Sequence, residues 1–109
     1  MSGGSGGGGG GGGRVNDETP CDRLRFDALL TNPQPGTVGT VTVNEVLDIL
    51  LNTLQNVLVV EVRKHDQLVG GLAGPDATRL RNCMNEGHQY NAVVLLVNGG
   101  QVRVRVEHS

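Results

Sequence analysis

The last twenty residues constrain the fold of this chain more than any other stretch. Two valine-rich runs flank residues 98–100 (Asn-Gly-Gly), and an Asn-Gly pair readily adopts the positive φ angles of a tight hairpin turn. In the second run, Val102, Val104 and Val106 alternate with polar residues, which is the period-two pattern of a strand with one buried face. The sequence therefore predicts a C-terminal β-hairpin with a defined core face.

Composition limits the 109 residues to one small domain. Residues 3–13 are glycine except for Ser5, and such a stretch buries no apolar surface and loses maximal backbone entropy on ordering. We therefore predict a disordered, glycine-rich tail or linker over residues 1–20 and a single β-rich domain over residues 21–109. Phe26 and Tyr90 are the only aromatic residues, so valine and leucine must build the core, and abundant valine favours strands.

Five segments before the hairpin have strand-like patterns: residues 23–28, 37–43, 46–51, 57–62 and 67–70. The strand at residues 23–28 places Phe26 toward the core. A polar turn over residues 52–56 separates the strands at residues 46–51 and 57–62. Residues 63–66 (Arg-Lys-His-Asp) are expected to form a charged hairpin tip between the strands at residues 57–62 and 67–70.

Residues 43–54 fit two templates. Their valines and leucines also fall at helical spacing, and Asn44 could cap such a helix. We favour a strand up to Val43, a tight turn over residues 43–45 and a second strand from Val46, because threonine and valine dominate the start of this stretch.

A short helix near residues 75–86 begins at Pro75 and is closed by Gly87 as a C′ glycine. The predicted fold class is mainly β, a β-rich α+β arrangement: a small curled sheet or barrel of about six strands with this helix at one end. Eight residues are predicted to be buried in the core: Phe26, Val59, Leu72, Leu80, Val93, Leu95, Val104 and Val106.

Charge and cysteine content restrict partners and compartment. The net charge of −2 gives no overall field for nucleic acid or an anionic membrane, and no apolar run approaches the length that spans a bilayer. Cys21 and Cys83 form no CxxC motif, and no apolar secretory segment follows Met1. We therefore predict a cytoplasmic protein; a reducing cytosol disfavours a Cys21–Cys83 disulfide, and the sequence leaves the pairing open.

Reactive constellations are missing from the sequence. Cys83 and His88 have C-x4-H spacing, but a zinc site needs four convergent ligands, so we predict no metal and no cofactor. No serine, cysteine or threonine lies in a nucleophile-elbow motif. The acidic residues are scattered singly and fit solvated strand faces, as Asp27 and Glu61 illustrate. The sequence predicts that the protein is not an enzyme.

Residues 57–106 resemble the second half of a HIRAN domain. The resemblance rests on a strand, residues 68–72 (Leu-Val-Gly-Gly-Leu), a helix with Ala77 and Leu80, residues 90–93 (Tyr-Asn-Ala-Val) and a closing Gly-Gly hairpin. HIRAN domains are small β-barrels of DNA-processing proteins that bind 3′ ends of single-stranded DNA. The family's basic and aromatic contact positions lie largely in its first half and do not align with this chain, so no binding residue is transferred.

Two functions of different classes follow. The leading prediction is a small, bacterial-type, non-enzymatic interaction module that binds a protein partner through a sheet edge or an apolar patch. The alternative is HIRAN-like binding of single-stranded nucleic acid on a basic sheet face. The residues predicted for that face are Arg63, Lys64, Tyr90, Arg103 and Arg105.

Overall fold

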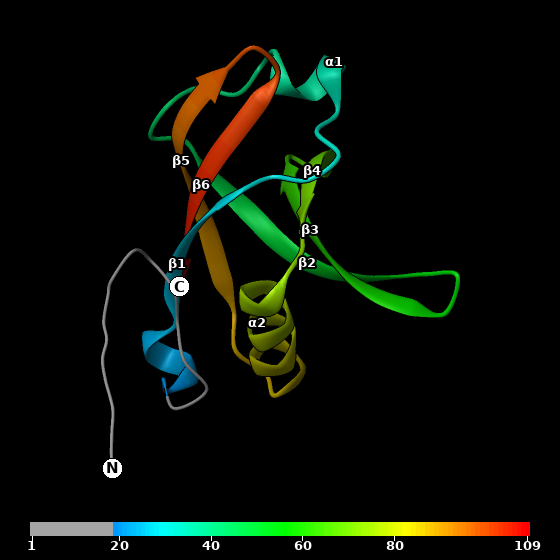
Figure 1. Ribbon diagram of the computed structural model, residues 1–109, viewed down its shortest axis with the longest axis vertical. Coiled ribbons are helices and arrows are strands. Elements are labelled where there is room, and N and C mark those ends of the chain that lie inside the picture. Colours follow the sequence, from blue (N-terminus) through cyan, green and yellow to red (C-terminus); the bar gives the residue numbers. More distant parts are fainter. Residues whose placement is uncertain (1–18) are drawn as a thin grey trace.

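The structure, a computed structural model, describes residues 19–109, so the disorder predicted for the glycine-rich tail concerns residues that lie almost wholly outside this range (Figure 1). The described strands are β1 (Arg25–Leu29), β2 (Val46–Leu54), β3 (Val57–Lys64), β4 (Gln67–Leu72), β5 (Tyr90–Asn98) and β6 (Gln101–His108). The helical segments are η2 (Cys21–Arg23), α1 (Pro35–Val38) and α2 (Pro75–Asn85). None of these helices has the length and apolarity that crossing a membrane requires.

All six strands belong to one antiparallel sheet with the order β1-β6-β5-β2-β3-β4. The predicted mainly-β class with about six strands and one short helix is confirmed, in its open-sheet form. The sheet does not close into a barrel, because its edge strands β1 and β4 do not pair with each other. The segment that follows β1 makes an isolated bridge to β4, between Thr31 and Gly71. A Cβ atom on the neighbouring Gly70 would lie 3.0 Å from the Thr31 carbonyl oxygen, so glycine permits this close approach.

The predicted C-terminal hairpin is present, with its turn shifted by one residue. Asn98 pairs with Gln101, so Gly99 and Gly100 form the two-residue turn and both have positive φ. The hairpins at residues 55–56 and 65–66 also have positive φ at both turn positions. This is the geometry that matches the right-handed twist of paired strands.

The strand predicted over residues 37–43 is wrong. Pro35 begins helix α1 at a position where its missing N–H costs nothing, and the Val38 N–H donates to the Gln34 carbonyl at 2.9 Å. Asn44, with φ of 74°, then leads into β2. The predicted strand from Val46 is confirmed and extends to Leu54, which excludes the helical alternative for residues 43–54.

The core is one cluster of buried side chains from the sheet, α1 and α2. Five of the predicted core residues are buried: Phe26, Leu72, Leu80, Val104 and Val106. Three predictions are wrong, because Val59, Val93 and Leu95 are only half-buried. In the apolar runs of β3 and β5, the inward positions belong instead to Val60 and Val62, and to Ala92 and Val94.

Helix α2 buries Ala77, Leu80 and Cys83 on one stripe, as its pattern predicts. It ends where Gly87 adopts φ of 106°, while the N–H of His88 donates to the Cys83 carbonyl at 3.2 Å. Cys83 is bonded to Cys21 of η2, with Cα atoms 5.6 Å apart. The sequence left this pairing open and disfavoured it on compartment alone; the fold brings together the two cysteines, which are 62 positions apart.

Candidate functional site

Strands β2 and β3 form a two-stranded ribbon that projects from the sheet (Figure 1). Strand β5 pairs with β2 from Val46 to Asp48, and β4 pairs with β3 from Val60 onward. Residues 49–60 lie largely beyond both neighbours, and we call them the β2–β3 arm. On its inner side the arm is supported by α2, where Arg81 donates to the Leu58 carbonyl at 3.2 Å.

The outer face of the arm is mostly apolar, and its largest apolar side chains are exposed. Leu50, Leu54 and Val57 project from it, with 57% of the Val57 surface accessible. Residues 49–60 contain no charged side chain, although exposed sheet edges usually carry charges that prevent association. Exposed apolar surface without such protection is typical of an interaction site.

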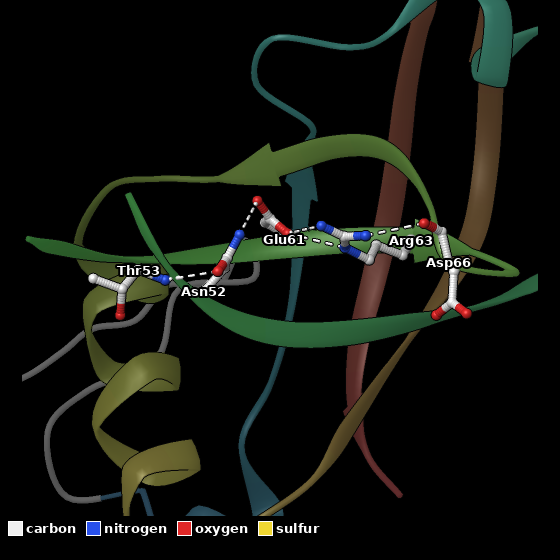
Figure 2. Close-up of polar contacts among 5 residues, drawn as sticks. All are labelled: Asn52, Thr53, Glu61, Arg63 and Asp66. Carbon is white, nitrogen blue, oxygen red and sulfur yellow. Dashed lines mark hydrogen bonds and ion pairs between the residues drawn. The ribbon is translucent and has the colours of Figure 1, made fainter. Parts of the chain in front are cut away.

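A buried carboxylate lies at the base of the arm (Figure 2). Glu61 is 6% exposed, and its Oε1 accepts hydrogen bonds from Nε and Nη2 of Arg63 at 2.9 and 2.6 Å. Its Oε2 accepts one from Asn52 of β2 at 3.2 Å. Arg63 also donates to the Asp66 carbonyl at 2.9 Å. We call Asn52, Glu61 and Arg63 the Glu61 network; it ties β2 to β3.

The charge of Glu61 is fixed by its partners. Burial raises the pKa of the carboxyl, but hydrogen bonds from Arg63 and Asn52, together with the charge of Arg63, lower the pKa more, so that it lies below its ordinary value. Glu61 is therefore ionised at neutral pH. Because an ionised carboxylate has about four acceptor positions, Oε2 retains capacity for a further N–H donor.

A pocket of about 290 Å³ opens beside this network, between the arm and the segment that crosses β4. Leu54, Val59 and Leu68 form much of its apolar wall, Glu61 supplies a charged group, and Thr31 borders it. Leu54 also belongs to the exposed face of the arm. The pocket and the arm are therefore continuous, and together they form the candidate binding surface.

The structure does not bring the five predicted nucleic-acid residues together. Arg63 is ion-paired with Glu61, and Lys64 with Glu45 at 3.0 Å. The ring of Tyr90 is 2% exposed, and its hydroxyl donates to the Cys21 carbonyl at 2.7 Å. Burial raises the pKa of the Tyr90 hydroxyl. A base has no accessible face of Tyr90 on which to stack, which contradicts that part of the prediction.

The two arginines of β6 lie apart from Arg63 and Lys64 of β3, because β5 and β2 separate the two strands in the sheet. Arg105 contacts Asp27 through two hydrogen bonds, at 2.8 and 3.2 Å. These bonds and the charge of Arg105 hold the pKa of the Asp27 carboxyl below its usual value, against a smaller opposing effect of burial. Arg103 is exposed. No continuous basic face joins these residues.

Sequence reasoning missed both parts of the candidate surface. Glu61 was assigned to a solvated strand face, yet it is an acidic residue inside an apolar run, with an arginine two positions later on the same face of the strand. A side chain in that setting needs a partner. The other missed signal was the absence of charge over residues 49–60.

Comparison with known families finds no family model that matches the chain, and comparisons with curated proteins and with solved structures find no match either. The fold and the surface define a class of protein: a small antiparallel β domain with a projecting apolar hairpin. The resemblance of residues 57–106 to HIRAN domains stays a prediction.

Proposed function

We propose that this domain is a non-enzymatic protein-binding module that holds an extended, apolar, uncharged segment of a partner protein against the β2–β3 arm. The observation that carries the proposal is the exposure of Leu50, Leu54 and Val57 on an uncharged ribbon. A charged ligand gains nothing from such a surface, whereas an apolar polypeptide removes it from water at about 25 cal/mol per Å².

The pocket supports a polypeptide rather than a small molecule as the ligand. Its volume of about 290 Å³ falls at the lower limit of small-molecule sites, which span roughly 300–1,000 Å³. It suits one large apolar side chain, while the rest of the segment lies along the exposed arm. Glu61 Oε2 would accept a backbone N–H of that segment, which adds orientation to apolar contact.

The state of Glu61 supports binding over catalysis. A general acid or base works best with a pKa near the operating pH, whereas the pKa of Glu61 is lowered and both of its oxygens have protein donors. The carboxylate is thus suited to holding the arm in shape and accepting a hydrogen bond.

A random dodecapeptide library displayed on phage tests the proposal. Selection on the wild-type protein is expected to enrich uncharged sequences with at least one large apolar residue. Leu54→Asp should weaken the binding of the selected synthetic peptides by at least about tenfold, because it places a charge in both the arm and the pocket wall.

Leu96→Asp is the matched control. Leu96 is 50% exposed and Leu54 51%, but Leu96 lies across β5–β6 from Arg103, away from the arm. Enrichment of no peptide, or equal loss in both variants, would overturn the proposal. Self-association of the wild-type protein that Leu54→Asp abolishes would assign the arm to a second copy of the chain instead.

The nucleic-acid alternative and the cytoplasmic location both stay predictions. No grouping of Arg63, Lys64, Arg103 and Arg105 favours nucleic acid. We keep the cytoplasm as a proposed location, although the Cys21–Cys83 pairing removes the cysteine argument for it; in a reducing cytosol this pair would be present as thiols.

A further inference from the structure

Three potential metal ligands converge where α2 ends, and a fourth, Cys83, is bonded to one of them. Cys21 comes from η2, Cys83 and Glu86 from the last turn of α2 and its cap, and His88 from the segment before β5. The turn at Gly87 folds His88 back toward Cys83, whose carbonyl accepts its N–H. One ligand atom from each of Cys21, Glu86 and His88 lies within 4.8 Å of the other two, and Cys83 is bonded to Cys21.

The donor set matches zinc. Two thiolates, an imidazole nitrogen and a carboxylate oxygen are ligands that tetrahedral zinc accepts. With metal–ligand bonds of about 2.0–2.3 Å, tetrahedral ligand atoms lie roughly 3.3–3.8 Å apart, so the atoms within 4.8 Å need only small movements. Beside them, Nδ1 of His88 lies 3.0 Å from Nε2 of His108. A hydrogen bond at the ring nitrogen that does not bind the metal orients a metal-bound imidazole.

We propose that reduction of the Cys21–Cys83 disulfide opens a zinc site formed by Cys21, Cys83, Glu86 and His88. Two molecules of a thiol reductant break the S–S bond: they supply two electrons and two protons, leave two cysteine thiols and become one disulfide themselves. Zn²⁺ then displaces both thiol protons to solvent and binds the two thiolates. Disulfide and zinc are alternative ties between η2 and α2.

This site explains the C-x4-H spacing of Cys83 and His88, which is too little for a zinc site by itself. The fold adds Cys21 from 62 positions earlier and Glu86 from the helix cap. The site shares no residue with the β2–β3 arm, so it stands independently of the proposed protein-binding function.

Cobalt and zinc titrations of the full chain, with and without a phosphine reductant, test the proposal. The reduced protein should bind one Co²⁺ with the intense visible bands of tetrahedral thiolate coordination, and zinc should displace it. The oxidised protein should bind zinc at least about 100-fold more weakly. His88→Ala and Glu86→Gln should each weaken zinc binding of the reduced protein by at least about tenfold.

His65→Ala provides the matched control, because His65 lies in the β3–β4 turn and should leave zinc affinity unchanged. The variants keep the disulfide, so circular dichroism of the oxidised proteins checks their fold before reduction. If reduction unfolds the wild type, one equivalent of zinc should restore its spectrum. Zinc binding without that recovery, equal affinity in both redox states, or no effect of His88→Ala would overturn the proposal.

Discussion

Two regions of the sheet use the same residue types in opposite ways. In the β5–β6 hairpin, Val102, Val104 and Val106 are completely buried. In the β2–β3 arm, Leu50, Leu54 and Val57 face solvent. The β5–β6 hairpin is flanked by β1 on the β6 side and by β2 on the β5 side, whereas the arm extends past both of its neighbours. Valine and leucine alone therefore do not mark the core; the face of the strand on which each lies also decides whether it is covered, as buried Ile49 and exposed Leu50 show.

The difference also shows how an exposed ribbon keeps its shape. An isolated two-stranded hairpin is marginally stable in water. The β5–β6 hairpin is stabilised by burial, while the arm carries the Glu61 network at its base and the Arg81 contact to Leu58 on its inner side. Polar contacts thus hold an apolar surface exposed to solvent.

The contrast between buried and exposed apolar residues is tested most strongly by truncating one leucine of the core and one leucine of the arm. Leu80→Ala should lower the free energy of unfolding by about 2–5 kcal/mol, because Leu80 is completely buried and leaves a cavity. Leu54→Ala should change it by less than about 0.5 kcal/mol. Urea denaturation measures both. A comparable loss in the two variants would mean that the arm is packed as core.

Removal of the disulfide should have the next largest effect. Cys21→Ala should cost about 2–4 kcal/mol of unfolding free energy under oxidising conditions with a chelator present, because the bond closes a long loop in the unfolded chain. Hydrogen exchange should show faster opening around η2 and α2 than in the wild type. Faster hydrogen exchange confined to the β2–β3 arm would contradict the independence of the arm from the disulfide.

Glu61→Gln should cost about 1–3 kcal/mol, because it leaves the partly buried Arg63 guanidinium without its ionic partner. Glu107→Gln is the matched control. Its pair with Arg25 spans 3.3 Å between largely exposed side chains, and loss of such a pair changes stability by about 0–1 kcal/mol. Equal costs in thermal or urea unfolding would show that the Glu61 network does not anchor the arm.

The stability difference between the wild type and Glu61→Gln should depend on pH. The folded pKa of Glu61 lies below the unfolded value of about 4.3, so the unfolded state takes up the proton first as pH falls. The ionised network stabilises the folded state fully above the unfolded pKa, and this contribution is lost as pH drops through the folded pKa. The urea midpoints of the wild type and Glu61→Gln, measured at pH 7, 5, 4 and 3, should converge as pH falls. A difference that stays constant would contradict the ion-pair explanation.

Local patterns in the sequence predicted most of the framework. Alternation placed Phe26, Val104 and Val106 inside, and Pro75 and Gly87 marked the bounds of α2 to within a residue. The strand pattern failed over residues 37–43, where a proline at the first helical position makes residues 35–38 the helix α1. Patterns also failed in uninterrupted apolar runs, where Val59 and Val60 look equivalent although one of them is on the outer face.

The candidate sites depend on long-range geometry that no local pattern contains. The meeting of Cys21 with Cys83 follows from how η2 packs against α2. The arm exists because β4 and β5 stop short of its end. Tyr90 and Arg105 looked like parts of one basic face, yet their partners, the Cys21 carbonyl and Asp27, come from the opposite end of the chain.

The central claim, that the β2–β3 arm binds an extended apolar segment, is tested most directly by NMR. A ¹⁵N-labelled wild-type protein would be titrated with the tightest-binding peptide from the library selection, and the shifts of its backbone amides followed. Binding on the arm predicts that the largest changes fall in residues 50–61 and around Leu68, and that Leu54→Asp removes them. Changes centred on the outer face of β5 and β6, with the arm unaffected, would contradict it.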